Sequence, residues 1–176
     1  MTDIQKNIRA IIESLDDNPD REGLIDTPRR YESFLREFLS PEDFSPTVFT
    51  SEGYDEMIVQ RNIPFYSMCE HHLLPFFGTA TVAYIPGDKI IGLSKLARTV
   101  DYFSRRLQNQ ERVTMQIADF LNNELSPKGV GVVLTARHLC MEMRGIEKPG
   151  AETTTSCLRG LFKTDASTRS EFLDLA

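Results

Sequence analysis

The hydrophobic pattern changes its period along the chain, and this change constrains the fold more than any single motif does. From Ile4 to Leu15 the apolar residues recur at helical spacing, which predicts an amphipathic N-terminal helix. Thr27 as N-cap and Pro28 at the first helical position then predict a second helix through RRYESFLREFL. Residues 40 to 56, rich in Ser, Pro, Asp and Glu, indicate a loop.

From residue 57 the pattern becomes extended. MIVQRNIPFYSM and GTATVAYIPG are rich in β-branched and aromatic residues and predict two strands, with CEHHLLPFF between them. KLARTVDYFSRRL, with Ser94 as its cap, and QERVTMQIADFLNNEL predict two helices. GVGVVLTARHLCMEMR and ETTTSCLRGLFK predict two further strands.

This order of elements predicts an α+β fold, in which adjacent strands are antiparallel and the helices pack on one face of a four-stranded sheet. We expect an N-terminal helical segment over residues 1–50 and a single catalytic domain over residues 51–176. Such a sheet has two edges that nothing in this chain obviously covers. A homo-oligomer that closes these edges is therefore favoured.

Charge and composition exclude some classes of function. The chain has 176 residues and a net charge of −6, which argues against a general nucleic-acid or membrane-surface binder because that role needs a positive face. No segment approaches the roughly 20 apolar residues of a membrane span, and the charged N-terminus does not resemble a signal peptide. We expect a cytoplasmic protein, in which the three widely spaced cysteines are thiols or metal ligands.

In the stretch SMCEHHLLPFFG, a cysteine, a glutamate and two of the chain's three histidines lie between an apolar run and an expected Pro-Phe-Phe-Gly turn. Cys69 and His72 form a C-x-x-H pair, and this spacing lets a thiolate and an imidazole reach one zinc ion from a turn. The alternative is a small buried cysteine beside histidines with ordinary hydrogen bonds. Two ligands alone do not make a zinc site.

A third ligand is expected from RHLCMEMRG. If this segment is a strand, His138, Cys140, Glu142 and Arg144 share one face, and Cys140 becomes the candidate ligand. Three protein ligands and an open fourth position are typical of catalytic zinc, which activates water. His138 then remains for proton transfer, as does His71, which could instead orient a ligand.

Charged residues elsewhere indicate a polyanion site. Lys95 and Arg98 lie one helical turn apart, and Arg144 ends the expected His-Cys strand, so the three cations can cluster on phosphates. Glu111 can accept two hydrogen bonds from a guanine edge. The alternative is that the cations are solvated surface charges and that Glu111 merely complements a helix N-terminus.

Four motifs, in order, resemble GTP cyclohydrolase I, the zinc enzyme that opens folate or pterin biosynthesis. They are CEHHLLPFFGTATVAYIPGDKIIGLSKLARTV, QNQERVTMQI, RHLCMEMRGI and TTTSCLRGLFKTD, with GLIDTPRRY preceding them. The resemblance extends from about Asp20 to Phe172. It implies the tunnelling fold (T-fold), with two helices between strands two and three of an antiparallel four-stranded sheet, assembled into a toroidal homodecamer with active sites between subunits.

The resemblance also implies a reaction and a set of site residues. GTP and water give formate and 7,8-dihydroneopterin triphosphate, with attack at C8 of the purine. The implied roles are zinc binding by Cys69, His72 and Cys140; proton transfer by His71 and His138; guanine binding by Gln110 and Glu111; pocket lining by Ser94; and triphosphate binding by Lys95, Arg98 and Arg144.

The chain departs from the family pattern in two places. In the segment before Gln-Glu-Arg, where the family often has a proline, this chain has Leu107. In the final expected strand it has Cys157 and Arg159 where smaller residues are common in the family. These departures bear on oligomer contacts or loop shape. Two alternatives stay open. One is a zinc hydrolase acting on another purine or pterin, and the other is a binding or structural protein in which zinc only stabilises the fold, with His71 as the fourth zinc ligand.

Overall fold

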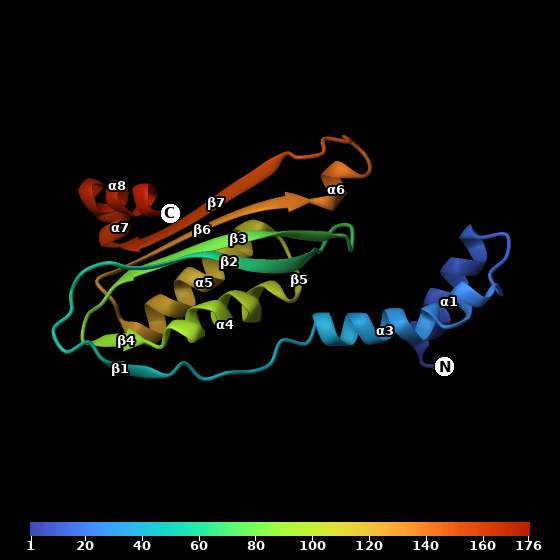
Figure 1. Ribbon diagram of the computed structural model, residues 1–176, viewed down its shortest axis with the longest axis horizontal. Helices are drawn as coiled ribbons and strands as arrows, with labels where there is room; N and C mark the ends of the chain where they lie inside the picture. The colour runs from blue at the N-terminus through green and yellow to red at the C-terminus, as the bar shows by residue number, and fades with distance from the viewer. The chain divides into compact units, whose positions relative to one another are not determined.

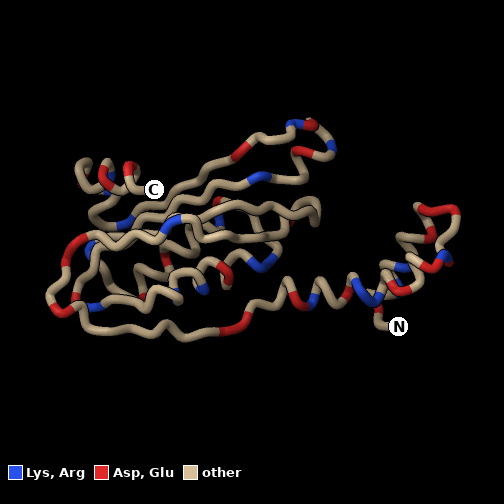
Figure 2. Tube along the Cα trace, in the orientation of Figure 1, with Lys and Arg blue, Asp and Glu red and all other residues tan.

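The computed structural model describes residues 1–176, and its contacts divide the chain into two compact units, Met1–Pro41 and Glu42–Ala176. Acidic and basic residues are interspersed along both units (Figure 2). None of the helices combines the length and the apolar character needed to cross a bilayer. Residues 42 to 50, which we placed with the N-terminal segment, belong to the second unit by their contacts.

The first unit is a small helical bundle. Its helices are α1 (Asp3–Leu15), α2 (Glu22–Ile25) and α3 (Thr27–Phe38). Both predicted helices are present, and the four-residue α2 between them was not predicted. Asp26, and not the predicted Thr27, occupies the cap position of α3. Pro28 therefore lies one residue further into the helix than predicted, still in the first turn, where proline is well tolerated.

The second unit contains one main sheet with two long helices against it (Figure 1). The sheet has the order β5-β2-β3-β6-β7. Its strands are β2 (Ile58–Cys69), β3 (Pro75–Ile85), β5 (Leu107–Gln108), β6 (Gly129–His138) and β7 (Glu152–Gly160). Helices α4 (Leu93–Ser104) and α5 (Gln110–Leu125) lie between β3 and β6 in the chain. The predicted α+β class is confirmed.

The four predicted strands pair antiparallel, and the short β5 adds a parallel partner to the end of β2. A separate ladder joins β1 (Val48–Thr50) to β4 (Lys89–Ile91), so the expected loop over residues 40 to 56 contains a strand. The expected Pro-Phe-Phe-Gly turn is also wrong, since β3 already begins at Pro75. The true turn is the shorter stretch from residue 70 to 74.

The core between the sheet and α4 and α5 follows the predicted helical periodicity. Val113, Ile117 and Leu121 of α5 are fully buried in one cluster with apolar side chains of β3 and β6. Ser94 is not the cap of α4, because Gly92 occupies that position and no side chain makes a cap hydrogen bond. Ser94 itself is exposed.

Helices also cover part of the opposite sheet face, which was not predicted. After β7 the chain forms α7 (Leu161–Thr164) and α8 (Ala166–Leu175), and these helices place Phe162 and Phe172 in a second buried cluster with Ala83 and Ile85. Gly131 makes room for both rings, since a Cβ atom there would lie 2.9 Å from each of them. The prediction that helices pack on one face only is therefore wrong.

Candidate metal centre

Three sulfur and nitrogen ligands converge at one end of the sheet. Cys69 is the last residue of β2, His72 lies in the turn to β3, and Cys140 lies in the short helix α6 (Leu139–Glu142) that follows β6. One ligand atom from each residue lies within 4.8 Å of the other two. The two cysteines are buried, whereas His72 is exposed. A pair of thiolates and an imidazole is a donor set that suits zinc.

Cys140 reaches this group by a different route from the one we predicted. The strand ends at His138, and the following residues coil into α6, so Cys140, Glu142 and Arg144 do not continue an alternating row. Glu142 instead accepts hydrogen bonds from Arg137 at 2.8 and 2.6 Å. The helical turn, rather than strand alternation, directs Cys140 toward Cys69.

The surroundings of Cys140 favour its neutral form in the absence of a cation. Burial raises the pKa of the Cys140 thiol, and the adjacent Cys69 thiol raises it further. The positive charge of Arg144 acts in the opposite direction. A bound cation would therefore favour the thiolate form of Cys140.

His138 is held between a ring and an amide. Its imidazole stacks on Phe76 with ring centroids 4.7 Å apart and an interplanar angle of 3°. Its Nε2 lies 2.7 Å from Oε1 of Gln110. Burial lowers the pKa of His138, and the carboxylate of Glu111 opposes that effect.

The hydrogen bonds of Gln110 identify the tautomer of His138. The Gln110 amide nitrogen lies 3.0 Å from the carbonyl oxygen of Leu134 and 2.9 Å from that of Thr153, and both of these oxygens can only accept. The amide oxygen therefore faces His138 and accepts a hydrogen bond from its Nε2–H. In the neutral ring, Nδ1 is then the nitrogen with a free lone pair.

The structure brings some of the predicted substrate residues to this end of the sheet and leaves others away from it. Glu111 and Arg144 lie near enough to act electrostatically on His138 and Cys140 respectively. Gln110 is 1% exposed, and its side chain is hydrogen-bonded to the sheet and to His138. Ser94, Lys95 and Arg98 lie in the first half of α4, which begins at the opposite end of the sheet (Figure 1).

His71 lies beside the metal-ligand group without being buried. Its Nδ1 is 3.8 Å from Sγ of Cys69, and the corresponding distance for His72 is 3.5 Å. Nε2 of His71 lies 3.9 Å from a carboxylate oxygen of Glu70, and 65% of the His71 side chain is exposed. His71 is therefore free to meet a ligand from solvent.

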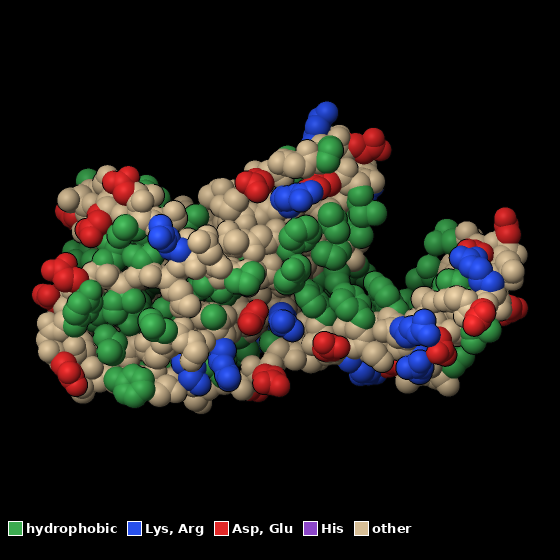
Figure 3. Space-filling model, in the orientation of Figure 1, with side chains coloured by type: hydrophobic (Ala, Val, Ile, Leu, Met, Phe, Trp, Pro, Cys, Tyr) green, Lys and Arg blue, Asp and Glu red, His purple; other side chains and the backbone are tan.

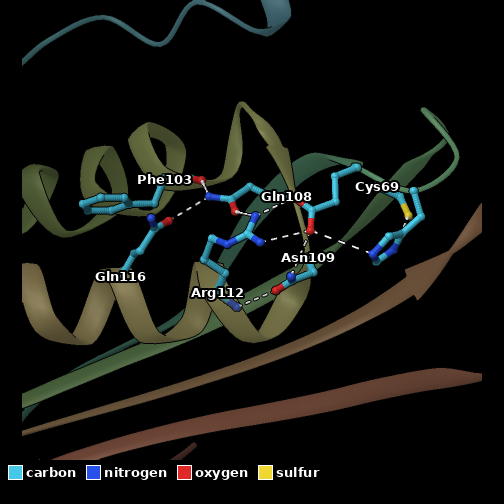
Figure 4. Close-up of polar contacts among 8 residues, drawn as sticks. Cys69, Phe103, Gln108, Asn109, Arg112 and Gln116 are labelled. Atoms are coloured by element: carbon cyan, nitrogen blue, oxygen red, sulfur yellow. Dashed lines mark hydrogen bonds and ion pairs between the residues drawn. The ribbon is translucent and has the colours of Figure 1, made fainter.

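A polar cluster beside the turn was missed by the sequence reasoning. Glu70 accepts hydrogen bonds from Arg112 and Asn109 at the start of α5. Figure 4 shows Arg112, Asn109 and Gln108 converging beside the turn that follows Cys69. Arg112 lowers the pKa of Glu70 through these hydrogen bonds. No local motif could have paired residues this far apart, because their contact depends on the unpredicted β5.

Apolar side chains are exposed around this end of the second unit. Figure 3 shows them gathered near the β2–β3 turn and α6. The exposed apolar residues of these segments include Leu73, Met141, Met143 and Ile146, and the last two are more than 60% exposed. An apolar surface of this kind often marks an interface.

Comparison with known proteins gives a consistent set of relatives. A sequence profile of GTP cyclohydrolase I matches residues 4–176. GTP cyclohydrolase 1 of Aquifex aeolicus is 54% identical over 173 residues, which cover 98% of this chain and 94% of that protein. The Brevibacillus brevis protein of the same name is 50% identical over 178 residues, covering 98% and 95% respectively.

A third relative, GTP cyclohydrolase 1 of a Sulfurihydrogenibium species, is 53% identical over 173 residues, with 98% of this chain and 92% of that protein covered. These matches cover nearly the whole chain, including the β2–β3 turn and α6, which together carry the metal-ligand group. The chain belongs to the GTP cyclohydrolase I family.

Proposed function

We propose that this protein is a GTP cyclohydrolase I, which converts GTP and water into formate and 7,8-dihydroneopterin triphosphate. The observation that carries the proposal is the convergence of Cys69, His72 and Cys140 within 4.8 Å in a chain of this family. Three protein ligands would leave a fourth coordination position for water or substrate, as in catalytic zinc sites.

Zinc is the metal that this donor set fits, since soft thiolates and an imidazole select it over hard cations. When bound, zinc would supply Lewis acidity that activates water at neutral pH. The other requirement is proton transfer to the purine ring. His138 can exchange a proton at Nδ1, because its Nε2–H is held by Gln110.

His71 is the second proton carrier in this proposal. It is exposed beside the metal ligands, and its ring nitrogens can donate and accept protons. Glu111 would accept hydrogen bonds from the guanine edge, and Gln110 would contribute through its backbone because its side chain faces the interior. Arg144 lies on the same side and would bind phosphate.

The remaining substrate residues point to an assembly. Lys95 and Arg98 would bind the triphosphate and Ser94 would line the pocket, but α4 places all three toward the end of the sheet opposite to Cys69. A neighbouring copy would then supply them. We include in the proposal the tunnelling fold, a homodecamer with sites between subunits, a cytoplasmic location, and the compact unit that contains residues 51–176 as the catalytic domain.

Incubation of the zinc-loaded protein with GTP tests the proposal. We expect stoichiometric formate and, after oxidation, a fluorescent pterin. Cys140→Ser is expected to abolish both products through loss of the metal. His138→Ala is expected to retain zinc and lose turnover. A folded, zinc-loaded oligomer that releases no formate would contradict the proposed function.

One observation favours a purely structural metal as the second candidate. His71 is close enough to Cys69 to become a fourth ligand after a small movement, since its Nδ1 lies 3.8 Å from the sulfur. A structural zinc would then be closed by four protein ligands. Zinc titration of His71→Ala separates the two: unchanged affinity with lost turnover supports catalysis, and a large loss of affinity supports the structural site.

A further inference from the structure

The turn that carries the two histidines has few bonds to the rest of the protein. Within the turn, Cys69 accepts hydrogen bonds from the backbone of His72 and Leu73, and these contacts are purely local. The side chains of His71 and His72 are exposed and approach Cys69, Glu70 and each other, and His72 also lies within 4.8 Å of Cys140. Glu70 is the residue whose hydrogen bonds attach the turn to β5 and to the start of α5.

Glu70 is held at both its backbone and its side chain. Its backbone N–H donates to the carbonyl oxygen of Gln108 at 2.9 Å. Its carboxylate accepts from Nη1 and Nη2 of Arg112 at 2.6 and 3.0 Å, a two-pronged contact. Asn109 adds a third hydrogen bond at 3.2 Å. A bidentate guanidinium fixes both the position and the plane of a carboxylate.

The guanidinium of Arg112 is itself fixed. The backbone N–H of Arg112 donates to the side chain of Asn109, the N-cap of α5, at 2.8 Å. Nη1 also donates to Oε1 of Gln108 at 3.3 Å. The Gln108 amide in turn donates to Phe103 and Gln116, so α4, β5 and α5 all support the same cluster (Figure 4).

We propose that Arg112 is a positioning residue for the metal centre: through Glu70 it holds the turn in the conformation that brings Cys69 and His72 to one ion. An isolated exposed ion pair contributes little to stability. Here, however, Glu70 stands in the sequence between Cys69 and the two histidines, so the pair acts on ligand geometry. The proposal rests on the metal site of the proposed function.

Metal affinity tests the proposal without any enzymatic assay. The full-length protein is stripped of metal, and its Zn²⁺ affinity is measured by competition with a chromophoric chelator. We expect Arg112→Ala and Glu70→Gln each to weaken Zn²⁺ binding by about 10- to 100-fold, the usual effect of losing a group that orients metal ligands. The double variant should bind Zn²⁺ about as tightly as whichever single variant binds it less tightly, because both changes break the same contact between Arg112 and Glu70.

A second readout reports geometry directly. With Co²⁺ in place of Zn²⁺, the visible absorption bands of Arg112→Ala should shift or weaken relative to the wild type. Arg112→Lys keeps the positive charge but cannot make the two-pronged contact of a guanidinium, so it should recover only part of the Zn²⁺ affinity. If Arg112→Ala does not fold, as judged by circular dichroism, Arg112→Lys and Glu70→Gln make the same comparison.

The chain offers a matched control in an ion pair between β7 and the same helix. Arg159 contacts Asp119 of α5 at 2.9 Å, and its side chain is 32% exposed compared with 40% for Arg112. Arg159→Ala should leave Zn²⁺ affinity and the Co²⁺ spectrum unchanged. Wild-type affinity and spectrum in Arg112→Ala, or an equal loss in Arg159→Ala, would overturn the proposal.

The two proposals fail separately in these experiments. A wild-type protein that binds Zn²⁺ tightly but releases no formate from GTP would refute the proposed function, while the loss of affinity in Arg112→Ala would still support the positioning role. Conversely, full GTP turnover in the wild type with intact Zn²⁺ affinity in Arg112→Ala would refute only the positioning role.

Discussion

Gly78 determines how closely β3 and β6 approach beside the metal centre. It pairs with Ala136, two positions along the ladder from the pair formed by Phe76 and His138. A Cβ atom at Gly78 would lie 1.9 Å from the carbonyl oxygen of Thr135, which is backbone and cannot rotate away. The absence of a side chain therefore permits the register that stacks His138 on Phe76.

Gly78→Ala is expected to lower the free energy of unfolding by about 3 kcal/mol, the upper end of the usual cost of overpacking. For a chain of this size, that loss corresponds to a fall in Tm of roughly 6 to 12 °C. Gly23→Ala is the control, since a Cβ there meets nothing within 4 Å. Its Tm should stay close to that of the wild type. Calorimetry of both variants measures the difference, and equal Tm values would show that the strands can separate without cost.

At the scale of elements, the sequence pattern predicted what depends on local periodicity. Helix α5 was predicted with its buried face correct, because Val113, Ile117 and Leu121 recur at helical spacing and Ser126 ends the helix in a left-handed conformation. The β1–β4 ladder was missed because each of its strands has three residues, too few to show an alternating pattern.

The candidate site was predicted for a partly wrong reason. Cys140 was expected beside Cys69 from strand alternation, whereas α6 brings it there. The contact between Glu70 and Arg112 had no local signal, since it joins residues 42 positions apart. The location of α4 relative to Cys69 also depends on tertiary packing. The convergence of the three candidate ligands was thus accessible from residue chemistry, but the supporting contacts were not.

Within the first unit, a buried carboxylate joins α1 to α3. Glu32 is 5% exposed, and it accepts hydrogen bonds from Arg36, Thr2 and Gln5. The hydrogen bond from Arg36 is the main cause that lowers the pKa of Glu32. A carboxyl with a lowered pKa in the folded state stabilises the fold above its unfolded pKa, and this contribution is lost as pH falls through the folded pKa.

Hydrogen exchange of the α1 amides, corrected for intrinsic rates, should therefore show constant protection from pH 7 to about 5 and a decline below about pH 4, near the unfolded pKa of glutamate. Glu32→Gln should show less protection at pH 7 and a shallower decline in acid. Glu37→Gln, an exposed position on the same helix, is the control. Parallel profiles for Glu32→Gln and the wild type would exclude Glu32 as the acid-sensitive group.

At the scale of the whole molecule, one chain does not unite the metal ligands with all of the proposed phosphate ligands. β3 runs away from the metal centre, and α4 starts beyond its far end and returns toward β5. An α-helix rises about 1.5 Å per residue, so Lys95 lies more than roughly 10 Å before the end of α4 that approaches Cys69. A heterologous contact between copies would bring Lys95 of one subunit to the metal centre of another.

Mixed oligomers test this arrangement. Cys140→Ser lacks a metal ligand and Lys95→Ala lacks a phosphate ligand, so each variant alone should have little activity. Suppose that each site takes its metal ligands from one subunit and Lys95 from another. In an equal mixture that is refolded together, random assembly around a heterologous interface should then give about one quarter of the sites both an intact Cys140 and an intact Lys95. If each chain completes its own site, every site keeps one lesion and no activity returns. Light scattering on the mixed and separately refolded samples controls for assembly, and an assembled mixture without recovered formate release would place Lys95 and Cys140 in the same subunit's site.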